Sequence, residues 1–169
     1  YVTTHKKYNE FNSEGKWVDL SDYSDGCSFL EYCAELHQDE EEPEFLFSDY
    51  EGFPSDFYGE TMTEEDIDNI LSYLALDEDD KEILDTYIDA MGKSYLDVDI
   101  DRVKELWHGS ADSPAEFTEN IAKELGMIPD NIPSWICIDW EASWESNLRY
   151  DYSYAQNKNT GEWHFFINH

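Results

Sequence analysis

Three groups of side chains in this 169-residue chain have residue types that could catalyse a reaction or bind a metal. Glu141 and Glu145 stand four residues apart, so a helix would place them one turn apart as a pair of carboxylates for glycoside hydrolysis. Cys33 and His37 have the same spacing and could hold a metal ion from one helix face. Residues 97–102, DVDIDR, imitate the opening of a calcium-binding loop.

Two of these groups lack a partner that their chemistry requires, and the carboxylate pair carries little information. The calcium loop needs glycine at its sixth position and glutamate at its twelfth, where this chain has Arg102 and His108. No second pair with ligand spacing follows Cys33 and His37, and close carboxylates are expected by chance among 41 acidic residues. The sequence also lacks G-x-S-x-G, a Walker loop and H-E-x-x-H. We therefore predict that the protein is not an enzyme and uses no cofactor and no metal.

The acidic side chains themselves are the unusual feature. The chain has 41 acidic and 10 basic residues, and a formal net charge of -31. The excess is spread over the chain, with 16 acids against 3 bases in 1–60, 15 against 4 in 61–111, and 10 against 3 in 112–169. An ordinary solvated helix mixes signs, because opposite charges four residues apart stabilise it and like charges destabilise it. The missing partners therefore need an explanation.

Local patterns predict the elements that position these acids. Strands are expected at 1–8, 15–21, 44–50 and 134–139, and a hairpin at 150–155 and 162–168. Helices are expected at 28–38, from a capping box at Thr63, up to Gly92, from Val98 to near Gly109, after Ser113, and at 140–148. This order predicts an α+β fold with a β-rich N-terminal domain with one helix (1–60), a helical domain (61–111) and a mixed α+β C-terminal domain (112–169).

Charge repulsion and aromatic content indicate the shape and the core. High net charge destabilises a compact body, so we expect the three small domains to form an elongated chain. The 6 Trp, 12 Tyr and 9 Phe residues can nevertheless fill a core, which argues against disorder. We predict that Trp17, Leu36 and Trp107 belong to that core.

Composition also excludes several classes of function. Ten scattered bases are too few for a phosphate-binding surface, so no nucleic acid is expected as a partner. No apolar run reaches 18 residues, so no membrane span is expected. Three cysteines without disulfide-framework spacing fit a reducing compartment, and we predict a cytoplasmic protein.

The charge suggests a function by its density. B-DNA carries one negative charge per roughly 1.7 Å, so 31 charges would match roughly 50 Å of duplex. An elongated chain of this kind could occupy a groove that is lined with Lys and Arg, as a mimic of DNA. General acidity for solubility or for high salt explains charge anywhere, but not the lack of partners on successive helices. An acidic chaperone or sink for basic DNA-binding proteins is the alternative function.

The stretch 15–54 resembles the ArdA antirestriction family. The pattern is Gly15-x-Trp17-x-Asp19-Leu20, then Glu35-Leu36-His37-x-Asp39-Glu40-Glu41-x-Pro43-Glu44, then Asp49-x-Glu51-Gly52-x-Pro54. A second stretch, at 132–142, is similar through Ile138-Asp139-x-Glu141. The chain departs from the family at Glu145, where a basic residue is expected.

The resemblance implies a cytoplasmic protein that is carried by mobile elements or phage. It implies inhibition of type I restriction–modification enzymes through the DNA-binding groove of their methyltransferase core. It further implies three small domains in an elongated, curved dimer that mimics bent DNA, with no cofactor.

Two sets of residues follow as candidates for binding. The carboxylates that we expect to stand in for phosphates, each of which could instead be an ordinary solvated acid, are Asp39, Glu40, Glu41, Glu42, Asp66, Asp68, Asp77, Glu78, Asp79, Asp80, Glu82, Asp85, Asp97, Asp99 and Asp101. The least charged segment, 112–169, is expected to form a homodimer, because two acidic chains repel least there. The interface candidates, which could instead fill the core of that domain, are Trp135, Ile136, Trp140, Tyr152, Tyr154 and Phe165.

Overall fold

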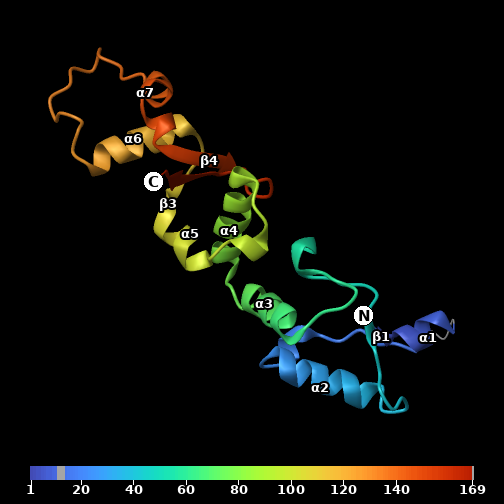
Figure 1. The fold of residues 1–169 in the computed structure, drawn as a ribbon. Coiled ribbons are helices and arrows are strands. Elements are labelled where there is room, and N and C mark those ends of the chain that lie inside the picture. The colour runs from blue at the N-terminus through green and yellow to red at the C-terminus, as the bar shows by residue number, and fades with distance from the viewer. Residues whose placement is uncertain (11–13, 169) are drawn as a thin grey trace. The chain divides into compact units, whose positions relative to one another are not determined.

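The computed structural model describes residues 1–10 and 14–168, and it divides the chain into two compact units. The first unit is Tyr1–Leu76, and the second begins at Asp77 (Figure 1). Each unit combines helices with a small antiparallel sheet, which confirms the α+β class. The prediction that 1–60 is β-rich with one helix is wrong, because its described residues form two three-residue strands and two α-helices. The three-domain layout and its boundaries after residues 60 and 111 stay a prediction.

The first unit packs two helices beside a two-stranded sheet. Strand β1 pairs antiparallel with β2, with Val2 opposite Phe47. Helices α2 and α3 pack on each other, and their buried Phe29 and Ile67 share one core with the strands. The elements are β1 (Val2–Thr4), α1 (His5–Asn9), η1 (Leu20–Asp22), α2 (Gly26–Leu36), β2 (Phe45–Phe47), η2 (Ser55–Phe57) and α3 (Glu64–Leu74).

The first unit differs from the sequence prediction at two strands and at one core residue. The strand expected at 1–8 ends at Thr4, because the Thr4 hydroxyl accepts the Lys7 backbone N–H (3.2 Å) and starts α1. The strand expected at 15–21 is reduced to one bridge between Lys16 and Val2, followed by η1. Trp17 is 48% exposed, so its assignment to the core is wrong. Leu36 is half-buried against the core.

The second unit has a three-stranded sheet with β5 at its centre. Its elements are α4 (Glu78–Met91), η3 (Tyr95–Asp97), α5 (Ile100–Leu106), β3 (Trp107–Ala111), α6 (Pro114–Glu124), α7 (Trp140–Ser146), η4 (Leu148–Tyr150), β4 (Tyr152–Gln156) and β5 (Trp163–Ile167). Neighbouring residues of a strand point to opposite faces of a sheet. Phe166 contacts Tyr87 of α4, whereas Phe165 packs with Phe117 of α6 and Trp144 of α7. Helix α4 therefore covers one face of the sheet, and α6 and α7 cover the other.

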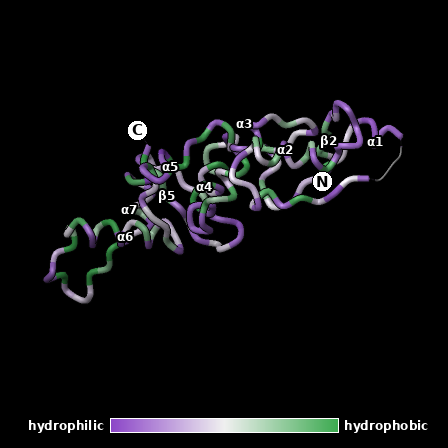
Figure 2. The backbone as a smooth tube through the Cα atoms, turned by 90° about the horizontal axis from the view of Figure 1, so that it is seen from below, coloured by the Kyte–Doolittle hydropathy of each residue, from purple (hydrophilic) through white to green (hydrophobic). Residues whose placement is uncertain are grey.

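Two predictions in this unit are wrong, and one is confirmed. The helix expected to end near Gly109 stops at Leu106, and Trp107, which is half-buried, begins β3 at the edge of the sheet. Residues 134–139 form no strand and pair with no strand of the sheet. The segment between α6 and α7 instead runs as an exposed loop, in which Figure 2 shows hydrophobic residues. The hairpin of β4 and β5 is confirmed. No helix of the described residues is both long and apolar enough to span a bilayer.

Candidate functional site

The candidate site is the set of 15 predicted carboxylates, and hydrogen bonds divide it into engaged and free members. A carboxylate that already accepts bonds from its own fold has a structural role and fewer lone pairs to offer. One that is exposed and unpaired keeps its full charge for a partner. The two units are described in turn.

In the first unit, Asp39 and Glu40 are engaged by a buried lysine. Lys7 Nζ donates to Asp39 Oδ1 (2.8 Å) and lies 4.0 Å from Glu40 Oε1. The Thr4 hydroxyl donates to the same Glu40 oxygen (2.6 Å), and Lys7 Nζ lies 3.1 Å from His37 Nδ1. The hydrogen bond from Lys7 lowers the pKa of Asp39. These two acids hold α1 to the segment that follows α2.

Asp66 and Asp68 are engaged at α3. Asp66 accepts the Thr63 backbone N–H (2.7 Å) in the predicted capping box, and this bond lowers the pKa of Asp66. Asp68 Oδ1 accepts the backbone N–H of Gly26 (2.7 Å), so α3 caps the start of α2. A side chain at Gly26 would lie 2.4 Å from the Glu64 carbonyl oxygen, which shows how closely the two helices approach.

In the second unit, three more acids begin or join helices. Asp77 accepts the Asp80 backbone N–H (2.8 Å) as the cap of α4, and Asp99 accepts the Asp101 N–H (2.9 Å) as the cap of α5. Asp80 accepts from Lys104 Nζ (2.8 Å), which ties α4 to α5. This hydrogen bond raises the pKa of Lys104.

Glu82 and Asp85 are engaged on the inner side of α4. Glu82 Oε1 accepts from the Thr160 hydroxyl (2.9 Å) and lies 3.1 Å from His164 Nε2. Asp85 accepts from the Tyr95 hydroxyl (2.7 Å). Glu82 therefore connects α4 to Thr160 and to β5, and Asp85 connects α4 to η3.

Glu82, Glu162 and His164 also place one ligand atom each within 4.8 Å of one another, as a metal site would. The Trp107 indole N–H donates to His164 Nδ1 (3.2 Å), and an indole can only donate. The proton of neutral His164 therefore lies on Nε2, where it faces Glu82. A metal at Nε2 would need that proton removed, so the residues fit a hydrogen-bonded tie rather than a metal centre.

The remaining predicted carboxylates are free or nearly free. Glu78 forms one exposed ion pair with Lys81 (3.1 Å), and such a pair is worth about 0–1 kcal/mol. Within residues 1–10 and 14–168, five predicted acids are exposed and form no side-chain hydrogen bond or ion pair: Glu41, Glu42, Asp79, Asp97 and Asp101. Glu64 and Glu65, in the first turn of α3, are exposed too and were missed by the sequence analysis. Their place directly after the cap at Thr63 was the signal that could have included them.

The residues first considered for catalysis or metal binding lie in environments that do not suit that chemistry. Glu145 on α7 pairs with Arg149, and Glu141 is exposed in the first turn of the same helix. Cys33 is fully buried, and burial raises its pKa to about 12, whereas His37 is engaged with Lys7. Residues 97–102 end η3 and begin α5 instead of forming a loop around an ion.

The dimer candidates lie in different environments within the second unit. Trp135 is 80% exposed and Ile136 is 44% exposed, on the loop between α6 and α7. Trp140 is half-buried beside a cavity of about 420 Å³ that Leu125 and Met127 also line. Tyr152 and Tyr154 are half-buried against Trp144. Phe165 has no exposed area, so the structure places it in the core of the unit and out of reach of a second chain.

Comparison with known proteins gives one match. The family described as "Antirestriction protein (ArdA)" matches residues 1–160 of the chain. No curated protein and no solved structure matches it.

Proposed function

The chain belongs to the ArdA antirestriction family, and we propose that it is a DNA mimic that inhibits type I restriction–modification enzymes. It occupies the DNA-binding groove of the methyltransferase core, where surface carboxylates take the places of phosphates. The observation that supports this most directly is the presence of exposed, unpaired acids in both units, beside other acids that the fold engages. If the acids served only to stabilise the fold, the exposed ones would be expected to have hydrogen-bond or ion-pair partners as well.

The free carboxylates recruit the enzyme by the same physics as DNA. A groove lined with Lys and Arg attracts negative charge over long distances and raises the rate of association. Each carboxylate contributes little, because an exposed ion pair is worth roughly 0.2–1 kcal/mol. Inhibition therefore depends on many charges together and on no single residue. The engaged acids, such as Asp68, keep the helices in place and contribute to the field only from there.

The proposed inhibitor is a cytoplasmic homodimer joined through segment 112–169 and carried by a mobile element. The exposed Trp135 and Ile136 support this interface, because large apolar side chains are enriched where partners meet. A second chain lengthens the mimic beyond what one chain can present.

Displacement of DNA tests the proposal. A labelled duplex with the recognition sequence is bound to a purified type I methyltransferase core, and the protein is titrated in at fixed salt. The proposal expects displacement at low protein concentration, and little displacement of the same duplex from a histone. Equal displacement from both would instead support the alternative, a general acidic sink for basic proteins.

Two triple variants of equal net charge test whether the position of the neutralised carboxylates matters. Changing Asp79, Asp97 and Asp101 to Asn should weaken displacement roughly 3- to 160-fold, if each charge contributes roughly 0.2–1 kcal/mol. The control changes three exposed acids outside the predicted set, Glu124→Gln, Asp130→Asn and Asp151→Asn. An equal effect of both triple variants would mean that total charge matters and position does not.

A further inference from the structure

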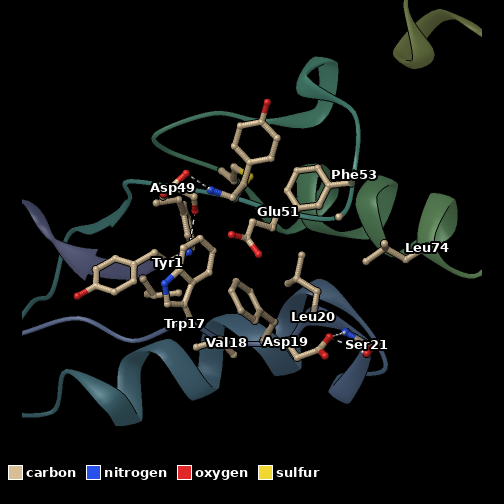
Figure 3. A pocket seen from close by; sticks show the side chains of 16 residues that line it. Tyr1, Trp17, Val18, Asp19, Leu20, Ser21, Asp49, Glu51, Phe53 and Leu74 are labelled. Carbon is tan, nitrogen blue, oxygen red and sulfur yellow. Dashed lines mark hydrogen bonds between the residues drawn. The ribbon is translucent and has the colours of Figure 1, made fainter.

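The first unit contains a cavity of about 660 Å³ that the antirestriction proposal does not use (Figure 3). Its walls come from β1, from the segment 17–21 and from the segment 49–53. These two segments carry two parts of the sequence pattern by which the chain resembles its family, and they lie about thirty residues apart. The fold brings them together around one hollow.

The walls of the cavity are aromatic and accessible. Trp17, 48% exposed, packs edge-on against the Tyr1 ring, with ring centres 5.7 Å apart. Tyr50 and Phe53, which also line the cavity, form a second aromatic pair with ring centres 5.1 Å apart. A large indole in this position leaves a π face open to a ligand, and Trp is the best aromatic partner for a cation.

The charged side chains that line the cavity are acidic. Figure 3 shows the Glu51 carboxylate among Trp17, Leu20 and Phe53, and Glu51 forms no hydrogen bond or ion pair with any described residue. Asp19, by contrast, already caps η1 through the Ser21 N–H (3.0 Å). Among the described residues that line the cavity, none has a lysine, arginine or histidine side chain. The positive group beside them is the Tyr1 ammonium, which donates to the Asp49 carbonyl oxygen (2.7 Å) and is attracted by the Glu51 charge without a hydrogen bond between the two.

We propose that this cavity receives an arginine side chain of the protein partner. A guanidinium group is planar and weakly hydrated, stacks on aromatic faces and pairs with a carboxylate, so Trp17 and Glu51 together match both of its properties. An anionic ligand would be repelled by Glu51, and an apolar ligand would bury that carboxylate without a hydrogen-bond donor. A lysine ammonium is more strongly hydrated and cannot stack as a plane. The source of the arginine rests on the proposed function, since a DNA-binding groove is rich in this residue.

The test uses the full chain and short peptides. The probe is acetyl-Gly-Arg-Gly amide, and its control replaces arginine by citrulline, which has the same shape and no charge. Binding is measured by isothermal titration calorimetry for every variant. For chains that keep Trp17 it is also followed by the Trp17 indole N–H signal in NMR spectra, which is assigned from its absence in Trp17→Phe. We expect saturable binding of the arginine peptide, at least tenfold weaker binding of the citrulline peptide, and intermediate binding of a lysine peptide.

Variants identify the groups that bind. Glu51→Gln should weaken binding of the arginine peptide about tenfold, since it removes one charge-assisted contact. Glu35→Gln, an exposed acid of the same unit outside the cavity, should leave binding unchanged. Trp17→Leu should also weaken binding, whereas Trp17→Phe keeps an aromatic face and should retain most of it. Both positions are exposed, and unchanged thermal melting shows that the variants fold.

The outcomes separate this inference from the function on which it rests. No binding of the arginine peptide, equal binding of the citrulline peptide, or an unaffected Glu51→Gln variant would overturn the inference. If the wild-type chain then still displaces DNA from the methyltransferase core, the proposed function stands alone. If the arginine peptide binds as expected but DNA is not displaced, the guanidinium site stands and the proposed function falls.

Discussion

The first turn of α4 contains one acid with a structural role and one that is free for a partner, so variants at these two positions can distinguish the roles. Asp77 accepts the Asp80 N–H (2.8 Å) and caps the helix, whereas Asp79 is exposed and has no partner among the described residues. The two acids carry equal charge and lie two residues apart. Three variants separate their roles: Asp77→Ala, Asp77→Asn and Asp79→Asn.

The expected magnitudes follow from the cap. Loss of an N-cap oxygen costs about 1 kcal/mol of stability, so Asp77→Ala should lower the melting temperature of the second unit by roughly 4–8 °C. Asn is as good a cap as Asp, so Asp77→Asn should change the free energy of unfolding by less than about 0.5 kcal/mol. Asp79→Asn should stay within the same limit, because it removes a surface charge and no hydrogen bond.

The assay combines unfolding with DNA displacement. Thermal and urea unfolding are followed by circular dichroism at one fixed protein concentration, because association of two chains makes the melting temperature depend on concentration. Asp79→Asn should weaken DNA displacement by a small factor and Asp77→Asn by less, since only the Asp79 carboxylate is free to pair with the enzyme. If Asp77→Asn destabilises as much as Asp77→Ala, charge and not the hydrogen bond begins the helix, and the division of the acids into engaged and free is refuted.

Four further predictions follow from the same charges and contacts. Added sodium chloride should raise the melting temperature, because the Debye length falls from about 10 Å at 0.1 M to about 3 Å at 1 M and unpaired acids then repel less; a flat curve would mean that they are compensated. The pKa of Asp66 is lowered by its Thr63 hydrogen bonds, so its stabilisation is complete above the unfolded value of about 3.9 and is lost as the pH falls through the lower folded value. Asp66→Asn should therefore lose less stability than the wild type between about pH 5 and about pH 2 in thermal melts, and equal losses would contradict this. Ellman's reagent at about pH 8 should modify exposed Cys137 first and Cys27 more slowly, because Glu64 raises the pKa of Cys27, and should reach buried Cys33 only on unfolding; a single rate for all three thiols would be inconsistent with the structure. Trp135→Ser should convert a dimer into a monomer in sedimentation velocity, and an unchanged dimer would move the interface elsewhere.

Local signals explain the parts of the fold that the sequence predicted correctly. The capping box at Thr63, the Ser113 cap before Pro114 and the end of α4 at Gly92 are all present. Gly92 adopts a left-handed conformation, with φ of 60°, that few other residues tolerate. Caps, turns and hairpins involve neighbours in the chain, so their chemistry can be read without knowing the tertiary structure.

The errors lie where the partner of a segment is distant. The apolar run at 134–139 has the composition of a strand, but a strand forms only beside another strand that is free to pair with it. Here the run stays in the loop between α6 and α7, and the sheet is built from β3, β5 and β4 instead, of which β3 overlaps the end of an expected helix. Trp17 was predicted to lie in the core with the other aromatic residues, yet its segment is joined to β1 by one bridge at Lys16 and its indole is exposed.

The sequence by itself determined the net charge, the α+β class and the family, because these depend on composition, local periodicity and a specific pattern of residues. Only the tertiary structure decided which acids remain free. Asp68 accepts from an N–H 42 positions earlier in the chain, and Glu82 faces a histidine 82 positions later. Periodicity indicates the face of a helix on which an acid lies, but the packing of helices and sheet decides what that face meets, and a carboxylate is free for a partner only where it meets water.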